Sequence, residues 1–311
     1  MKPIGLFTAD IHLSHKPPKA RACEHNWYRC MKRYLGELKE IVDYWSEQAN
    51  QPVPLFYAGD IFDHWDAPAQ LINFAIENLP KGYAIPGQHD LPYHNDKLLF
   101  KSAYWTLVKA GTLYEVPSDG RLFPKMFVSG FGWKKPILRG LDDPGGIKVA
   151  LLHKYLWSVP ETGHGKAAEK DNVSNLPVEA LSYDFIFSGD NHIPFTAVCS
   201  NTTVVNCGSF MARNTSQRGY EPAVHVLYDN RDLDTAIIRT ARKDRWIDKE
   251  EKKQEPKINP KLGKLIKKFS KLSADHVDFY SQIRIALEDE SVNEEVKQIV
   301  LKGLDAIKRR K

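Results

Sequence analysis

Five apolar runs of strand length in this chain end in side chains that can bind a metal ion. The runs "IGLFTA", "VPLFYAG", "YAIP", "IKVALLH" and "YDFIFSG" lead, in order, to Asp10 and His12; Asp60 and Asp63; Gln88, His89 and Asp90; His153; and Asp190 and His192. A glycine stands beside most of these side chains, which lets the backbone and an ion approach closely. Because ligands of sheet proteins gather beyond the carboxyl ends of strands, we expect a fold that brings five strand ends together.

Each motif alone has a plainer explanation. A pair such as Asp10 and His12 is more often a turn cap than a set of ligands, and a single strand-end histidine such as His153 is more often a satisfied polar group. The segment "GDIFD" alone could be a loop with a helix cap. Five strand ends of the same chemistry favour a metal site instead, and mixed carboxylate and imidazole ligands suit Mn, Fe or Zn better than calcium.

The order of the apolar patterns indicates a mixed α/β fold. Apolar residues recur at a helical period from Trp27 to Trp45, and again after Asp66, an expected helix cap, until Pro80 ends the pattern. The first half therefore alternates strands and helices, and the second half is mostly strands. Several runs are too apolar to alternate, which predicts strands covered on both faces. We expect packed sheets in the middle with helices outside.

Composition places the chain among soluble proteins of a reducing compartment. Its 311 residues are 42% hydrophobic and 27% charged, and no apolar run approaches the ~18 residues that a membrane helix needs. The apolar stretch before Asp10 is too short for a signal segment. The four cysteines form no CxxC pair. The expectation is a cytoplasmic protein without a membrane segment.

A change in composition near Lys243 divides the chain. We expect a core over residues 1–242, a charged linker over 243–260 and a basic helical extension over 261–311. The basic segment would attract polyanions, although a plain solvated surface explains it equally well. The last helix, which opens with a capping pattern at Ser291, has one apolar face. That face must be buried against its own core, a second copy of the chain in a homodimer, or a partner protein.

The motif series resembles the calcineurin-like metallophosphoesterase superfamily over about residues 1–240. It consists of Asp10-x-His12, Gly59-Asp60-x-x-Asp63, Gly87-Gln88-His89-Asp90, His153 and Gly189-Asp190-x-His192. Within that superfamily the chain is most similar to the SbcD-type nuclease subunit of double-strand-break repair and its phage relatives. This closer similarity rests on "GDIFDHWDAP", "IPGQHDLP", "YDFIFSGDNHIPF" and "VVNCGSFMARN".

The resemblance implies a β-sandwich core flanked by helices and a Mn-dependent DNA nuclease, exonuclease or endonuclease, of DNA repair and recombination. Such nucleases work beside an SbcC-like coiled-coil ATPase that contacts helices following the phosphoesterase core. The helix at 291–311 is similar in position to such a docking element, and the basic segment before it could touch DNA.

The resemblance also implies a role for each motif residue. One ion would be held by Asp10, His12, Asp60 and His192, and the other by Asp60, Gln88, His153 and Asp190. Two such ions would activate a water for attack on a phosphate ester. His89 would protonate the leaving oxygen while Asp90 orients its ring. Asp63 would brace the loop or a ligand histidine, and Arg213 could reach a phosphate or serve only as a surface residue.

Two positions depart from the family pattern, and both belong to the second ion. The family usually has Asn where this chain has Gln88, and His where it has Asp190. A longer amide and an added carboxylate should shift that position from Zn toward Mn or Mg, and Fe is also open. The plainer alternative is a degraded site that holds metal poorly.

Two other functions remain open at this point. One is a small-molecule phosphoesterase, such as a nucleotide or UDP-sugar pyrophosphate hydrolase. "DIHLS" and "GDIFDHW" echo lipid-A pathway hydrolases, although those carry Arg in place of His89. The other is a non-catalytic scaffold with a structural ion. The pair His89 and Asp90 argues against a scaffold, because a structural ion has no use for a nearby acid.

Overall fold

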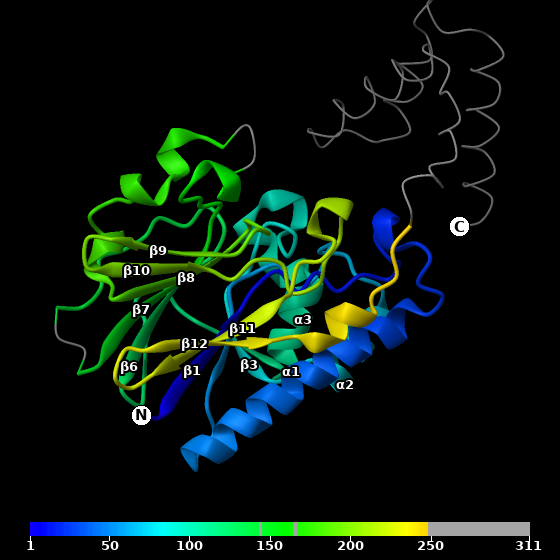
Figure 1. Ribbon diagram of the computed structural model, residues 1–311, viewed down its shortest axis with the longest axis horizontal. Helices are drawn as coiled ribbons and strands as arrows, with labels where there is room; N and C mark the ends of the chain where they lie inside the picture. The colour runs from blue at the N-terminus through cyan, green and yellow to red at the C-terminus, as the bar shows by residue number, and fades with distance from the viewer. Residues whose placement is uncertain (143–144, 164–166, 248–311) are drawn as a thin grey trace, which may run out of the picture. The chain divides into compact units, whose positions relative to one another are not determined.

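Two six-stranded sheets pack face to face in the computed structural model, which describes residues 1–142, 145–163 and 167–247 (Figure 1). The first sheet has the order β12-β11-β1-β2-β3-β4 and the second β5-β6-β7-β8-β10-β9. Strands β1 to β4 run parallel, as do β6, β7, β8 and β10, while the remaining strands pair antiparallel at the edges. Helices flank the sheets, so the expected α/β sandwich is confirmed.

The strands of the first sheet are β1 (Pro3–Thr8), β2 (Leu55–Tyr57), β3 (Gly82–Ala84), β4 (Leu113–Glu115), β11 (Ala223–Tyr228) and β12 (Leu233–Ile237). Those of the second sheet are β5 (Arg121–Phe123), β6 (Met126–Phe131), β7 (Ile147–His153), β8 (Phe185–Gly189), β9 (Phe195–Cys199) and β10 (Thr202–Asn206). The central strands β1, β6 and β8 are buried along their whole length. That is why their sequences are mostly apolar and do not alternate between apolar and polar residues.

A stack of aromatic rings joins the two sheets. The ring of Phe7 on β1 lies 3.7 Å from that of Phe187 on β8 and 4.9 Å from that of Phe56 on β2, measured between centroids. All three side chains are fully buried. Burial of aromatic area of this size is a main source of stability in a sandwich core.

Helix α1 (Trp27–Ala49) covers the outer face of the first sheet together with α2 (Ala69–Asn78) and α3 (Ala103–Lys109). The side chain of Asn26 accepts a hydrogen bond from the Arg29 N–H at the start of α1. Helix α2 begins later than the expected cap at Asp66. Pro68 holds an extended conformation, and a residue before proline avoids the helical region, so the helix starts only at Ala69.

Short 3₁₀ turns fill the connections, at Lys19–Arg21, Pro92–His94, Asp96–Lys101, Pro160–Thr162, Glu169–Asp171, Val173–Asn175, Ala180–Ser182, Thr215–Gln217 and Arg239–Lys243. Several of them cover the outer face of the second sheet, where Leu176, Ala180 and Tyr183 pack in one cluster with Ile186 and Val204. No helix in the described ranges combines the length and apolarity that crossing a bilayer requires.

The compact core runs from Met1 to Ile247. A buried arginine holds its last residues: Arg21 Nη2 lies 2.6 Å from Asp244 Oδ1 and 2.9 Å from Glu24 Oε1. The Tyr34 hydroxyl donates to the other oxygen of Asp244 at 2.5 Å. The first residues of the segment expected to be a linker therefore pack on the core. The rest of that linker and the expected extension over 261–311 lie outside the described residues.

Strand β11 carries a partly buried histidine, with a buried Nε2 atom, that should make stability depend on pH. Burial lowers the pKa of His225 to about 4, against 6.5 for an ordinary histidine, and its Nε2 has no hydrogen-bond partner among the described residues. The unfolded chain takes up the proton more readily, so stability is complete above pH 6.5 and is lost as pH falls toward 4. In the variant His225→Leu, the loss of unfolding free energy between pH 7.5 and pH 5 should shrink by about 1–2 kcal/mol.

Urea unfolding at both pH values measures this difference. The exposed His25 provides the matched control, since His25→Leu removes one histidine without emptying a buried position. An equal pH response in wild type and His225→Leu would contradict the prediction.

Candidate metal centre

The side chains predicted to bind metal all lie at the carboxyl ends of parallel strands. Asp10 and His12 follow β1, Asp60 follows β2 and Gln88 follows β3, all from the first sheet. The second sheet supplies the remaining three, at His153, which ends β7, and at Asp190 and His192, which follow β8. The face-to-face packing of the sheets thus brings together side chains that lie up to 182 positions apart in the chain.

The loops that carry these side chains have unusual backbone conformations. Asp10, His12, Asp60 and Asp190 have φ angles of 52°, 50°, 50° and 80°. Only a few per cent of residues other than glycine adopt this left-handed region, and such residues cluster at functional sites. The loops after β1 and β2 also hold each other, because the Asp10 N–H donates to Gly59 O and the His12 N–H to Asp60 O.

Two glycines leave room for the neighbouring functional groups. A Cβ atom on Gly87 would lie 2.0 Å from Asp60 Oδ1, and one on Gly59 would lie 2.2 Å from His153 Nδ1. Atoms cannot approach that closely, so any larger residue would displace the carboxylate or the imidazole. Glycine at these positions therefore fixes where the two side chains sit.

The first cluster consists of Asp10, His12 and His192, whose ligand atoms lie within 4.8 Å of one another. The Nε2 atoms of His12 and His192 are 3.0 Å apart, and Asp60 Oδ2 lies 3.7 Å from that of His12. Burial lowers the pKa of both histidines, that of His192 to about 4. Both rings are consequently neutral near pH 7, the state in which imidazole binds a metal ion.

The second cluster consists of Asp10, Asp60 and His153. The Nδ1–H of His153 donates to Ala58 O at 2.6 Å, which leaves its Nε2 directed at the cluster. That Nε2 lies 2.8 Å from Gln88 Oε1 and 3.5 Å from Asp60 Oδ1. Asp10 is common to this cluster and to the first one, and Asp60 is common to this cluster and to a third group with His12 and His89.

Gln88 joins the ligands expected for the second ion. Its amide oxygen faces His153 Nε2, and its amide NH₂ donates to Asp190 Oδ1 at 2.7 Å. The two departures from the family pattern are therefore in direct contact with each other. The side chain of Gln88 thus reaches the carboxylate of Asp190 directly.

These residues fit a pair of divalent cations. Asp60 Oδ2 and His12 Nδ1 are buried and have no hydrogen-bond partner among the described residues. Although burial opposes the charge of Asp60, attraction to the adjacent His153 outweighs it and lowers the pKa of that carboxyl, so Asp60 is ionised. A buried anion with an unsatisfied oxygen calls for a cation, and the oxygen and nitrogen donors present suit Mn, Fe or Zn.

His89 stands at the edge of this centre with a half-exposed ring. Its Nδ1 lies 2.8 Å from the carbonyl oxygen of Asp63, so Nδ1 carries a proton and donates. Its Nε2 lies 3.9 Å from Asp60 Oδ2, and the ring meets that of His12 edge-on at 5.1 Å between centroids. With 40% of its side chain exposed, the ring can exchange protons with solvent and meet a substrate.

The role predicted for Asp90 is wrong. Its carboxylate accepts hydrogen bonds from the N–H groups of Gly87, Ile61 and Phe62 at 3.0–3.2 Å and is fully buried. These bonds hold the turn that carries Gln88 and His89. The backbone carbonyl of Asp63, instead of the Asp90 carboxylate, orients the ring of His89, because the backbone amides already engage both oxygens of Asp90.

Asp63 and Arg213 form an ion pair beside His12. Arg213 Nη2 lies 2.6 Å from Asp63 Oδ1, and its Nη1 donates to the carbonyl of His12 at 3.2 Å. Asp63 Oδ1 also lies 3.8 Å from His12 Nδ1. That distance is too long for a hydrogen bond, so the bracing of His12 by Asp63 stays a prediction. The phosphate contact expected of Arg213 stays a prediction, since 17% of its side chain is exposed and its guanidinium is already paired.

Two buried asparagines support the centre and were not predicted from the sequence. The Asn206 NH₂ donates to the carbonyls of Asn191 and Ile193 at 2.6 and 2.8 Å, which holds the loop on both sides of His192. The Asn191 NH₂ in turn donates to Leu156 O at 2.6 Å. The signal was present, because an amide at the end of the apolar run "TTVVN" has no place in a strand core unless it is fully hydrogen-bonded.

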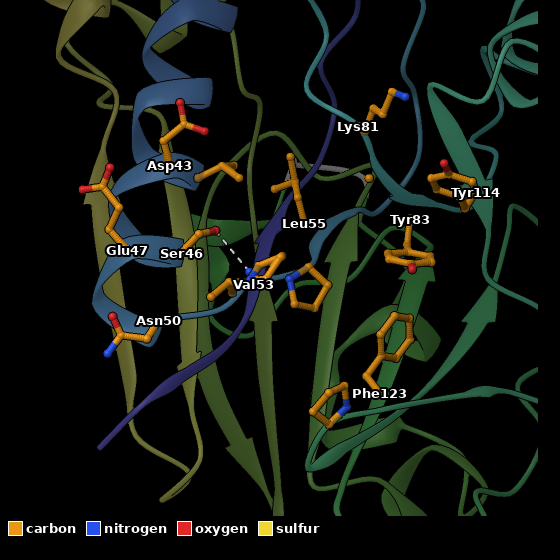
Figure 2. Close-up of a pocket in the computed structure, with 15 residues that line it drawn as sticks. Asp43, Ser46, Glu47, Asn50, Val53, Leu55, Lys81, Tyr83, Tyr114 and Phe123 are labelled. Carbon is orange, nitrogen blue, oxygen red and sulfur yellow. Dashed lines mark hydrogen bonds between the residues drawn. The ribbon is translucent and has the colours of Figure 1, made fainter.

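A groove of about 990 Å³ lies at the amino ends of β2 and β3, away from the candidate centre (Figure 2). Its walls include Asp43 and Glu47 of α1 and Tyr83, and it also touches Leu55 and Gly82, the first residues of β2 and β3. None of the predicted ligands lines it. The candidate chemistry is therefore confined to the carboxyl edge.

Comparison with known protein families agrees with this geometry. The sequence profile described as calcineurin-like phosphoesterase matches residues 6–194. Among solved structures, TT1561 of Thermus thermophilus is 14% identical, with 77% of this chain and 100% of that chain covered and a TM-score of 0.43. YfkN from Bacillus subtilis, described as a calcineurin-like phosphoesterase, is 15% identical, with coverages of 77% and 91% and a TM-score of 0.41. An archaeal phosphodiesterase is 13% identical, with coverages of 75% and 98% and a TM-score of 0.35. No curated protein sequence matches the chain.

Enlarging Gly87 should damage the centre while leaving the fold intact. In Gly87→Ala the new methyl group collides with Asp60, so we expect at least about tenfold weaker Mn binding, since displacing one ligand costs on the order of 1.4 kcal/mol or more. Calorimetric titration of the metal-free protein measures the affinity. Gly36→Ala in α1 is the matched control, because nothing lies within 4 Å of its Cβ position. Equal Mn affinity in the two variants would contradict the proposed position of the centre.

Proposed function

The protein belongs to the calcineurin-like phosphoesterase family, and from that premise we propose that it is a metal-dependent DNA nuclease. The observation that carries the proposal is His89, whose side chain is 40% exposed. Its Nε2 lies 3.9 Å from Asp60 Oδ2, while its Nδ1 donates to the backbone carbonyl of Asp63. A site that served only to hold structural ions would have no need of such an acid. Resemblance to SbcD-type nucleases supports DNA as the substrate.

The residues have distinct tasks in this reaction. Bound divalent ions neutralise phosphate charge and lower the pKa of a water molecule. Asp60 lies between the two clusters, with Oδ1 3.5 Å from His153 Nε2 and Oδ2 3.7 Å from His12 Nε2. The water first releases one proton to solvent, so that the attacking group is hydroxide. As the bond from its oxygen to phosphorus forms and the bond to the leaving oxygen breaks, the protonated His89 ring transfers its Nε2 proton to the leaving oxygen. The Asp63 carbonyl stabilises the protonated ring by accepting from Nδ1.

Incubation with Mn and linear duplex DNA, single-stranded DNA or bis-p-nitrophenyl phosphate tests the proposal. We expect wild-type protein to degrade DNA, and His89→Ala to lose about 10²–10⁴-fold in rate, the usual contribution of a general acid. Metal content of the variant should equal that of the wild type. Gln is a useful second replacement, because His89→Gln keeps the size and removes the titratable nitrogen.

The rival functions predict other outcomes of the same assay. Hydrolysis of bis-p-nitrophenyl phosphate without DNA degradation would contradict the nuclease and favour a small-molecule phosphoesterase. A cavity of about 410 Å³ next to His153 and Asp190 favours that second candidate, because it has the size of a small-ligand site. Bound metal without any activity would leave only a scaffold.

We propose Mn as the physiological ion, with Mg or Fe as alternatives. The amide oxygen of Gln88 and the carboxylate of Asp190 would supply two oxygen ligands where the family usually has one amide and one imidazole. Hard carboxylate oxygen favours Mn or Mg over Zn. In the double variant Gln88→Asn and Asp190→His we expect the rate ratio of the Zn-loaded to the Mn-loaded enzyme to rise about tenfold. An unchanged ratio would contradict the assignment.

We also propose that the nuclease acts in DNA repair and recombination with a coiled-coil ATPase partner. The support is the resemblance stated above, and the expected docking helix at 291–311 lies outside the described residues. The partner, like the alternative of a homodimer, can be tested by sedimentation of the full chain alone and with a candidate ATPase.

A further inference from the structure

A cavity of about 410 Å³ opens beside the second cluster. Two of the predicted ligands, His153 and Asp190, form part of its wall. The rest of its lining comes from the loop after β6, the end of β7 with the residues that follow it, and a 3₁₀ turn, and it includes Trp133, Lys134, Lys135, Lys154, Lys170 and Asp171. A group bound there would lie next to the ion expected at His153.

Positive charge predominates in this cavity. Four lysines line it against two aspartates, and one of the two, Asp190, is a predicted metal ligand. Lys135 is paired with Asp96 at 2.5 Å, and Lys154 lies 3.8 Å from Asp171. Lys134 and Lys170 have no acidic partner within the described ranges. Two unpaired ammonium groups beside a metal centre are suited to an anion.

The loop that carries Lys134 is hydrogen-bonded to a segment of the centre. The Trp133 N–H donates to Pro86 O at 3.1 Å, which attaches the loop to the segment leading to Gln88. Lys134 has a φ of 61°, a strained value for lysine, and its Nζ lies 3.9 Å from the centroid of the Trp133 ring. The ammonium group is therefore held in place beside the cavity.

The cavity on the other side of the centre has no such excess of charge. It measures about 450 Å³ and borders Asp63, where Lys16 and Lys19 face Asp63 and Asp66. Positive charge is thus concentrated on the side of His153. An anionic substrate that extends beyond the centre would be favoured in that direction.

We propose that the cavity beside His153 binds a second phosphate group of the substrate, next to the one that is cut. This inference rests on the proposed function and deepens it, because it defines the substrate as one with at least two phosphates in a chain. A nucleic-acid strand has that chemistry, and so does a nucleoside diphosphate derivative. The two kinds of substrate differ in the distance between neighbouring phosphates, so each can be tested with its own compound.

The double variant Lys134→Gln and Lys170→Gln tests the inference. For a thymidine trinucleotide, which has two phosphates, we expect KM to rise about fivefold or more, since each exposed ion pair contributes up to ~1 kcal/mol. For bis-p-nitrophenyl phosphate, which has one, KM should change less than twofold. The matched control, Lys16→Gln and Lys19→Gln, removes the same charge from the other cavity and should leave both KM values near those of the wild type.

Equal effects on the two substrates, or an equal effect of the control variant, would overturn the inference. If the wild type cuts only the small ester, the nuclease proposal fails by itself. Competition then decides the inference: ADP should inhibit ester hydrolysis more strongly than AMP in the wild type, and the double variant should lose that preference. A preference that the double variant retains would overturn the inference in that case too.

Discussion

The stacking of Phe7 against Phe187 helps to fix the position of one sheet relative to the other. The candidate centre depends on that position, because both sheets supply its residues. These rings hold β1 of one sheet against β8 of the other, and Asp10 and Asp190 follow shortly after the ends of the two strands. The Asp190 N–H donates to the Asp10 carboxylate at 3.0 Å, so the contact between sheets continues directly into the ligands. This apolar contact therefore contributes to the fixed distance between the ligands of the two sheets.

Several features of the centre lower the free energy of unfolding of the fold around it. Buried carboxylates lie next to one another, four ligand residues adopt left-handed backbone conformations, and two buried polar atoms of the centre have no partner in the described ranges. Each such feature is unfavourable by about 1–3 kcal/mol. Strain of this kind persists where surrounding packing imposes it, and here the aromatic core and the buried Asn206 network do so. Bound cations would relieve the electrostatic part.

The surroundings of the centre are unequal on its two sides. On the side of His12, the acid Asp63 is matched by Arg213, and the adjoining cavity is balanced in charge. On the side of His153, lysines exceed aspartates and two of them are unpaired among the described residues. Because of this difference, a substrate that extends beyond a single phosphate would be attracted toward the side of His153. A substrate with only one phosphate would not be affected in this way.

The sequence by itself determined which residues could form the centre and which edge of the fold they would occupy. Apolar runs that end in Asp, His or Gln predict strands with ligands at their carboxyl ends, because local propensity and burial pattern are properties of short segments. Only the tertiary structure decided the partners of each side chain. Nothing in "GQHD" shows that Asp90 turns to three backbone amides while the Asp63 carbonyl orients His89. Such pairings depend on how two sheets pack, and packing is set by all of the buried side chains acting together.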